Sequence, residues 1–340
     1  MTLNTTQTIQ TISVAPMMDW TDRYCRYFHR ILSPNIRVYT EMITDQAILH
    51  GHLEKLLAFD PIEHPIALQL GGSDPEKLYR ATEIVLNNGY GYDEINLNLG
   101  CPSDRVQAGR FGLCLMKEPE RVIDCLNAIA QAISETKHKK TNLSSPILSA
   151  KTRTGVDSLD SYDFLENFIF TLQDNTPCKF FIIHARKGWL SGLSPKENRE
   201  IPPLDYERVY QIKKNFPNLT IHINGGIKTL SEIQTHLTHL DGVMLGRVAY
   251  HQPYLLAQIE KKFFSPISSN LDLNLDLDLD LDLDLPSREA ILEKLAPWIS
   301  SQIQQGVRPH QIFRHMLGLY HGTPCSKKFK NNPELFLNNF

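Results

Sequence analysis

Cys101 is the residue whose setting points most directly to chemistry. It stands between Gly100 and Pro102, two residues that interrupt regular structure, directly after residues 94–99, in which polar and apolar side chains alternate. This period-two pattern predicts a strand, so the thiol is expected on a turn at the strand's end. A thiol with an ordinary pKa of about 8.5 can donate a proton near neutral pH. Considered alone, the residue is better explained as a small buried cysteine in a loop, and only the other features of the chain favour a chemical role.

Eight short apolar or alternating segments predict strands, and helical patterns lie between most of them. The strands are expected at residues 13–17, 38–42, 66–70, 95–99, 147–151, 180–184, 220–224 and 242–246. Helices are expected at residues 22–32, from Pro75 onward, and at residues 121–134, 162–172 and 230–239. This alternation is typical of an α/β fold of the (β/α)8 or TIM-barrel type. The alternative is an open doubly wound sheet, but the chain lacks the Gly-x-Gly-x-x-Gly turn that usually accompanies it.

The carboxyl ends of the expected strands carry polar, basic or glycine residues almost without exception. In barrels of this type that face carries the chemistry. A barrel with a purely structural role has no reason for such residues at all eight ends. The residues are Pro16 and Met17, Glu41, Gln69, Asn98 to Cys101, Lys151, His184, Asn224 to Gly226, and Gly246 with Arg247.

Glycine-containing turns follow the seventh and eighth strands, Asn224-Gly225-Gly226 and Gly246-Arg247. Barrel enzymes commonly bind phosphate there, because glycine lets backbone N–H groups approach an anion closely. We therefore expect a phosphate site that Arg247 completes. Gln69 offers a donor and an acceptor to the edge of a heterocycle. One of Lys151 and Arg153 is expected to point inward, where a lysine needs an anion or a polar ligand.

The loop after the sixth strand is rich in basic residues. Arg186, Lys187, Lys196 and Arg199 lie close together there, with Trp189 among them. Positive charge and an aromatic ring suit an anionic backbone and a stacked base. Without the other features, a solvated charged loop would explain the pattern equally well.

Composition restricts the remaining possibilities. The 340 residues have a net charge of -3, so any basic face must be local. The six cysteines form no Cys-x-x-Cys pair and show no regular spacing, which indicates neither a metal site nor a disulfide framework and fits a reduced cytoplasmic protein. No apolar run is long enough for a membrane span, and the first eleven residues do not resemble a signal peptide.

The character of the chain changes near its carboxyl end. Residues 271–285 repeat Leu-Asp with one Asn, and this predicts an expanded acidic linker. Helices are expected at residues 287–305 and 311–320, in a segment with seven Lys or Arg and three Glu. We therefore divide the chain into a barrel over residues 1–262, a linker over 263–286 and a small all-α segment over 287–340.

Several of these motifs together resemble the tRNA-dihydrouridine synthases, and within them the A-type subfamily. Residues 13–22 (SVAPMMDWTD) resemble the opening motif of that family, and residues 67–72 (ALQLGG) and 98–103 (NLGCPS) resemble its flavin and active-site motifs. Residues 181–203, with His184-Ala185-Arg186-Lys187 and Leu193 to Arg199, look specifically A-type. The resemblance runs from about residue 12 to residue 322.

The resemblance implies a flavin mononucleotide (FMN) barrel with a helical tRNA-binding segment, working as a monomer without a metal. It implies NADPH-dependent (or NADH-dependent) reduction of uridine to 5,6-dihydrouridine at D-loop positions 20 and 20a, with hydride passing from flavin N5 to uracil C6. Cys101 would then donate the proton to C5. The tRNA would contact Asn98, Lys196, Arg199 and Arg314. The implied FMN ligands are Pro16, Met17, Met18, Gln69, Lys151, His184, Asn224, Gly225, Gly226, Gly246 and Arg247.

The chain departs from the family pattern at its end, and two other functions stay open. Residues 323–340 are short and lack the expected Arg-rich continuation. An incomplete helical segment is expected to weaken tRNA binding without affecting the flavin. One alternative is a flavin barrel that acts on a free pyrimidine. The other is a tRNA-binding protein with impaired turnover.

Overall fold

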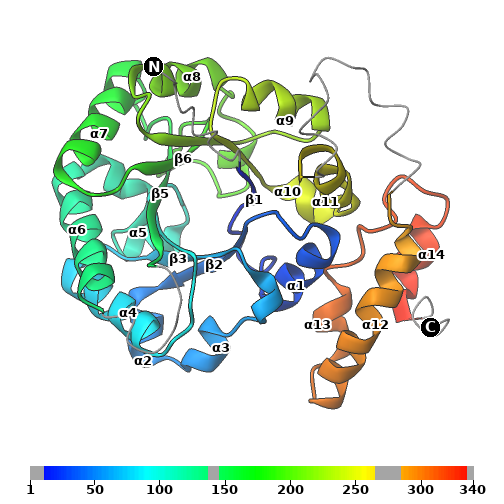
Figure 1. Cartoon of the computed structure of the whole chain (residues 1–340). Coiled ribbons are helices and arrows are strands. Elements are labelled where there is room, and N and C mark those ends of the chain that lie inside the picture. The colour runs from blue at the N-terminus through cyan, green and yellow to red at the C-terminus, as the bar shows by residue number, and fades with distance from the viewer. Residues whose placement is uncertain (1–10, 137–144, 265–284, 335–340) are drawn as a thin grey trace, which may run out of the picture.

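The computed structural model describes residues 11–136, 145–264 and 285–334. Within them, eight parallel strands form one curled sheet surrounded by helices (Figure 1). The Leu-Asp repeat up to Asp284 lies outside the described residues, so its interpretation as a linker stays a prediction. The strands are β1 (Thr11–Val14), β2 (Val38–Thr44), β3 (Ile66–Gly71), β4 (Glu94–Asn98), β5 (Ile147–Arg153), β6 (Phe180–His184), β7 (Thr220–Asn224) and β8 (Gly242–Leu245).

The sheet order is that of a closed barrel. The strands follow one another as β1-β8-β7-β6-β5-β4-β3-β2, and each neighbouring pair is parallel. The ring closes where the backbone N–H of Val14 donates to the carbonyl of Arg37 (2.9 Å) and the N–H of Arg37 donates to Ile12 (3.0 Å). The predicted (β/α)8 barrel is therefore confirmed, and the doubly wound alternative is excluded.

Helices connect the strands and surround the ring. The longer ones are α1 (Arg23–Leu32), α4 (Pro75–Asn87), α6 (Pro119–Glu135), α7 (Tyr162–Asn175), α8 (Tyr206–Asn215), α9 (Leu230–Leu237) and α12 (Arg288–Gln304). The short ones are α2 (Asp45–His50), α3 (Leu53–Leu57), α5 (Asp104–Ala108), α10 (Arg247–His251), α11 (Tyr254–Ile259), α13 (Pro309–Phe313) and α14 (Ser326–Asn331). The 3-10 helices are η1 (Pro61–Glu63), η2 (Gly112–Lys117) and η3 (Glu197–Arg199), and η4 (Glu260–Phe264) is a π-helix.

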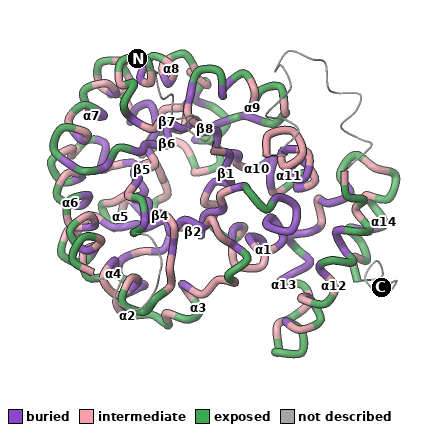
Figure 2. The backbone as a smooth tube through the Cα atoms, viewed as in Figure 1, coloured by how far each residue is buried: buried purple, intermediate pink, exposed green. Residues whose placement is uncertain are grey.

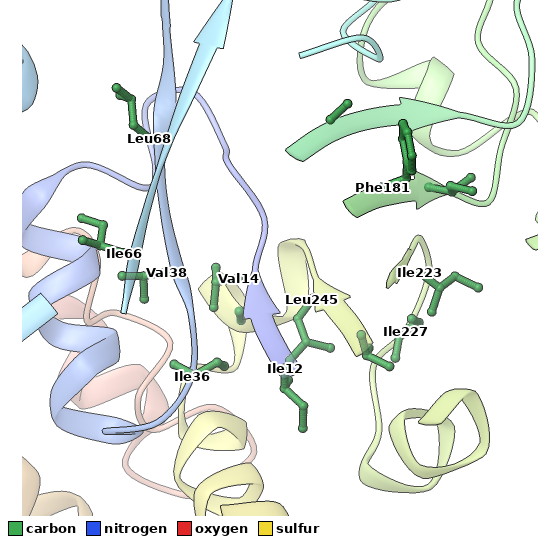
Figure 3. Packing of buried hydrophobic residues seen from close by; sticks show 14 of the residues in the cluster. Ile12, Val14, Ile36, Val38, Ile66, Leu68, Phe181, Ile223, Ile227 and Leu245 are labelled. Atoms are coloured by element: carbon green, nitrogen blue, oxygen red, sulfur yellow. The ribbon is translucent and has the colours of Figure 1, made fainter. Parts of the chain in front are cut away.

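Two clusters of buried apolar side chains separate the inside of the barrel from its outside. The larger cluster joins the outward-facing strand residues to the helices, and Figure 3 shows part of it, including Ile12 and Val14 of β1 and Leu245 of β8. The smaller cluster lies inside the ring and consists of Ala15, Tyr39, Ala67, Phe180, Ile182 and Met244. The strands are buried on both faces, whereas the helices present exposed residues on their outer sides (Figure 2).

Two predicted elements differ from the observed ones. The first strand lies two residues earlier, at Thr11–Val14, because Ala15 and Pro16 continue the apolar run into the loop. The helix predicted for residues 311–320 ends at Phe313 and continues as turns. In that turn Gly318 lies against the backbone of His251, where an added Cβ would come within 2.5 Å of the carbonyl oxygen. The segments α12 and α13 lie beside α1, and α14 lies next to α12 (Figure 1).

Candidate active site

Asn98, the last residue of β4, holds the turn that carries Cys101. Its side-chain Oδ1 accepts hydrogen bonds from the backbone N–H groups of Gly100 (3.2 Å) and Cys101 (3.0 Å). The thiol is partly exposed and lies 3.6 Å from the hydroxyl of Ser103. The carbonyl of Cys101 accepts from the N–H of Leu113 (3.0 Å). The Asn98 side chain and the Leu113 N–H therefore fix the turn through its backbone groups, and Cys101 stays partly exposed.

Arg153 holds the same turn from the neighbouring strand, and sequence reasoning did not assign it to the site. Its Nε donates to the carbonyl of Gly100 (2.8 Å), and its Nη1 donates to the carbonyls of Lys187 and Asn198 (both 3.1 Å). Burial lowers the pKa of Arg153 to about 10. We expected one of Lys151 and Arg153 to be inward; the structure places both largely inside the protein. Their separation of two residues on one strand was the available signal.

Lys151 and Asn224 come together from β5 and β7, the two strands that flank β6. The Lys151 ammonium donates to Asn224 Oδ1 (3.2 Å), and Asn224 Nδ2 donates to the carbonyl of Met244 (2.8 Å). Burial, reinforced by the charge of Arg153, lowers the pKa of Lys151 to about 7. Among the described residues the amine therefore has one acceptor for three N–H donors, and an acceptor on a ligand would stabilise its charged form.

His184, at the end of β6, is kept neutral by its surroundings. Burial, followed by the charges of Arg153 and Lys151, lowers its pKa well below the ordinary value. Its ring packs against Gly225, where an added Cβ would lie 2.7 Å from the ring carbon Cδ2. A neutral imidazole has one donor and one acceptor nitrogen, which suits a polar ligand without adding charge.

Of the two glycine turns after β7 and β8, the first has backbone angles that require glycine. Gly225 and Gly226 have φ values of 122° and 75°, which side-chain-bearing residues rarely adopt. Gly246 has open space where a Cβ would stand. Arg247 follows it but is exposed, and its guanidinium pairs with Glu200 (2.6 Å) rather than turning toward the glycines.

The residues after β1 form a tight turn at the same face. The hydroxyl of Thr21 accepts from the N–H of Met17 (3.0 Å), and the N–H of Thr21 donates back to the Met17 carbonyl (2.9 Å). Pro16 and Met17 are half-buried, while Met18 is exposed. Gln69 lies deeper, with both ends of its amide bonded to Asn96 and Asn98.

The basic loop after β6 is organised around one buried asparagine. Asn198 accepts from the N–H of Trp189 (2.7 Å) and donates to the carbonyls of Trp189 (3.0 Å) and Leu193 (3.1 Å). Lys196 and Arg199, on either side of it, are exposed. Lys187 lies over the Trp189 ring and forms an ion pair with Asp160 (2.6 Å), so its positive charge is partly neutralised within the protein.

Arg314 joins the C-terminal segment to the barrel. Its guanidinium pairs with Asp22 (2.6 Å), and the buried neighbour His315 approaches the same carboxylate (3.0 Å). Asp22 also caps α1 by accepting from the N–H groups of Tyr24 and Cys25. Arg314 thus lies at this junction and is still partly exposed.

Comparison with known proteins agrees with this arrangement. The model for the family "Dihydrouridine synthase (Dus)" matches residues 13–337. The chain is 49% identical over 324 residues to the tRNA-dihydrouridine(20/20a) synthase of Yersinia pestis, covering 95% of this chain and 86% of the relative. The proteins of that name from Shewanella oneidensis and Escherichia coli K12 are each 50% identical, covering 94% of this chain and 87% and 84% of the relatives.

A solved structure shares the fold at low sequence identity. A complex of 2-naphthoyl-CoA reductase with 2-naphthoyl-CoA superimposes with a TM-score of 0.52 at 10% identity, over 76% of this chain and 52% of the other. In the described ranges no helix is both long enough and apolar enough to cross a membrane. The match of one family model to nearly the whole chain, together with relatives at about half identity, shows that this chain belongs to the dihydrouridine synthase family of oxidoreductases.

Proposed function

We propose that this protein reduces uridine to 5,6-dihydrouridine at positions 20 and 20a of tRNA, using FMN and NADPH. The observation that carries the proposal is the accessible Cys101 thiol, fixed on its turn at the strand ends of a barrel whose relatives bear the tRNA-dihydrouridine(20/20a) synthase name. A thiol held in position at this face can act as a general acid and donate a proton to a carbon of a bound substrate.

The residues at this face suit FMN. The positive-φ turn of Gly225 and Gly226 and the open Gly246 offer backbone N–H groups to a phosphate. Lys151 has one acceptor, Asn224 Oδ1, and would gain a second from the polar edge of the flavin ring. The remaining proposed ligands at this face are Pro16, Met17, Met18, Gln69, His184, Asn224 and Arg247. Arg247 would have to leave Glu200 to reach a phosphate.

The chain's own residues then complete the reaction. Bound flavin, reduced by NADPH, supplies the hydride that uracil accepts at C6. Negative charge develops at C5 and the adjacent carbonyl, and the Cys101 thiol donates the proton that neutralises it. A positioned acid of this kind contributes about 10²–10⁴ in rate. Asn98 and Arg153 keep the thiol in place through Gly100 and the Cys101 backbone N–H.

Basic residues around the rim provide the tRNA contacts. Lys196 and Arg199 project from the loop that Asn198 braces, and Arg314 lies at the junction with the C-terminal helices. The target base must leave the tRNA stack to reach the barrel interior. A contact between tRNA and Asn98 stays a prediction, because the structure uses both polar atoms of its amide within the protein.

One titration tests cofactor, reductant and substrate together. The visible spectrum of the purified protein is recorded, NADPH is added anaerobically, and unmodified tRNA follows, with fully modified tRNA and free uridine as controls. Flavin bands that bleach with NADPH and return only with unmodified tRNA support the proposal. Recovery with free uridine would indicate a free-pyrimidine reductase, and no recovery would indicate a tRNA-binding protein with impaired turnover. A protein that FMN cannot reconstitute would overturn the flavin assignment.

A further inference from the structure

A continuous chain of buried polar side chains runs along the inside of the barrel from Asn98 to Glu94. Asn98 Nδ2 donates to Gln69 Oε1 (2.8 Å), and Gln69 Nε2 donates to Asn96 Oδ1 (2.7 Å). Asn96 Nδ2 donates to Ser149 Oγ (2.7 Å), and the Ser149 hydroxyl donates to the Glu94 carboxylate. We call these five residues the amide chain. They are between 0% and 8% exposed.

Strand geometry places the amide chain. Glu94, Asn96 and Asn98 are two residues apart on β4, so their side chains share its inner face. In the sheet register, Asn96 stands opposite Gln69 of β3 and Ser149 of β5. Three neighbouring strands therefore supply side chains at matching heights, and the chain of hydrogen bonds crosses between them.

Both ends of the amide chain permit only one direction of hydrogen bonding. At the upper end, the backbone N–H groups of Gly100 and Cys101 can only donate, so Asn98 must present its oxygen. At the lower end, Glu94 pairs with the guanidinium of Arg37 (2.7 Å), and an ionised carboxylate only accepts. Between these ends every amide has one orientation that satisfies all its partners. Reversing any of them would bring two donors or two acceptors together.

We propose that Glu94 is a remote positioning residue for Cys101. Through the amide chain its carboxylate reinforces the one orientation of Gln69 and Asn98 that the N–H groups of the turn accept, and Asn98 in turn holds the turn that presents the thiol. The inference rests on the proposed function only in taking Cys101 as the proton donor. Glu94 itself lies at the opposite end of the chain of bonds and touches no reacting group.

Ser149 and Tyr39 provide a matched pair of variants. Both are fully buried, and both donate a hydrogen bond to the same oxygen of Glu94, Tyr39 over 2.6 Å. Ser149→Ala breaks the amide chain, whereas Tyr39→Phe removes a comparable bond and leaves the chain intact. If the carboxylate acts only structurally, the two variants should behave alike.

The first measurement is the alkylation rate of Cys101 by a maleimide in the full-length protein, followed by peptide mass spectrometry. The exposed Cys325 serves as the internal reference. Ser149→Ala should change the Cys101-to-Cys325 rate ratio about fivefold, the size that one buried hydrogen bond supports, and Tyr39→Phe should leave it unchanged. Ser149→Thr, which keeps the hydroxyl, should restore the wild-type ratio. Equal ratios in Ser149→Ala and Tyr39→Phe would overturn the proposal.

The second measurement is tRNA reduction. Ser149→Ala should lower kcat about fivefold without changing KM for tRNA, because Ser149 is buried inside the barrel. If Ser149→Ala fails to fold, Glu94→Gln carries the same test, since an amide at that end can donate as well as accept. A wild-type protein inactive on tRNA would refute the proposed function, while the alkylation comparison, which needs no substrate, would still decide whether Glu94 positions Cys101.

Discussion

The two faces of strand β4 have opposite chemistry. The outward residues Ile95, Leu97 and Leu99 are fully buried against the helices and belong to the large apolar cluster. The inward residues 94, 96 and 98 are also buried, but they are polar and form hydrogen bonds to side chains of the neighbouring strands β3 and β5. The outer face stabilises the fold by removing apolar area from water, whereas the inner face positions groups and requires every partner to be present. Substitutions on the two faces should therefore have different consequences.

Cys101→Ala should have the largest effect on activity and almost none on stability. Turnover is expected to fall at least about 100-fold, because the proton donor is lost. The free energy of unfolding should change by no more than about 0.5 kcal/mol, because the thiol is partly exposed. Dihydrouridine content of treated tRNA and urea denaturation measure the two quantities. Cys325→Ala is the control for loss of a thiol, and a fully active Cys101→Ala protein would remove Cys101 from the mechanism.

Leu97→Ala should show the reverse pattern. The side chain is fully buried between β4 and the helices, so its truncation is expected to lower the free energy of unfolding by about 2–5 kcal/mol. The rate of Cys101 alkylation in the folded protein should stay at the wild-type value, because the inner face is unchanged. A large change in that rate at a small loss of stability would mean that the two faces of β4 are coupled.

Lys151→Met should stabilise the flavin-free protein. The amine titrates near 10.5 when unfolded and at about 7 when folded, so its charged form disfavours the folded state below pH 7. Removing it should raise the free energy of unfolding by about 1–3 kcal/mol at pH 6, less than the full shift implies because the group borders an open site. The gain should fade as pH rises from 7 toward 10.5.

The same variant should lose flavin. Lys151→Met protein is expected to purify with less bound cofactor than the wild type, as measured by its visible spectrum. Lys214→Met, on the last turn of α8, is the control for removing a lysine. A variant that gained no stability at pH 6 would show that the folded protein already satisfies the Lys151 ammonium.

Asp22→Asn should have the smallest effect, and it extends the comparison to the junction with the C-terminal helices. Burial opposes ionisation of Asp22, but His315, the Cys25 N–H and Arg314 outweigh it and lower the pKa of the carboxyl below 3.8. Its charge therefore contributes stability that is present above pH 4 and lost as pH falls through the lowered pKa.

Asparagine keeps the cap of α1, so Asp22→Asn isolates the charge. The free energy of unfolding should fall by about 1 kcal/mol at pH 7, and the difference between variant and wild type should shrink as the pH falls below 3.8. Chemical denaturation over this pH range measures it. A difference that stayed constant as the pH fell would assign the effect to packing rather than charge.

Local patterns predicted most of the fold. Five of the strands were predicted within one residue at both ends, because Pro65, Gly71 and similar residues mark their limits. Asp74 with Pro75 correctly marked the start of α4, where Asp74 is the N-cap. The helix predicted for residues 311–320 failed because Gly318 packs on the backbone of His251, a contact between segments far apart in the chain.

The sequence predicted which residues belong to the candidate site, but it did not predict most of their hydrogen-bond partners. The positions of Cys101 and Lys151 at the strand ends followed from the strand pattern. The bonds from Arg153 to two loops did not, because carbonyl groups of different loops carry no sequence signal. The amide chain was also missed, since alternation shows which residues face inward but not which strand supplies each partner. The roles of the predicted FMN and tRNA ligands, and the domain limits at residues 262 and 286, stay predictions.

The fixed direction of the amide chain has a consequence for how the protein can change through evolution. Replacing Asn96 by Asp, or Gln69 by Glu, would remove an N–H donor and bring two acceptor oxygens together. Rotating the other side chains could not correct this, because the hydrogen-bond direction is fixed at both ends of the amide chain. A second exchange further along could restore the pairing. These five positions are therefore expected to show strong epistasis, with viable alternatives arising in compensating pairs, whereas Leu97 and its outward neighbours should accept isolated conservative replacements.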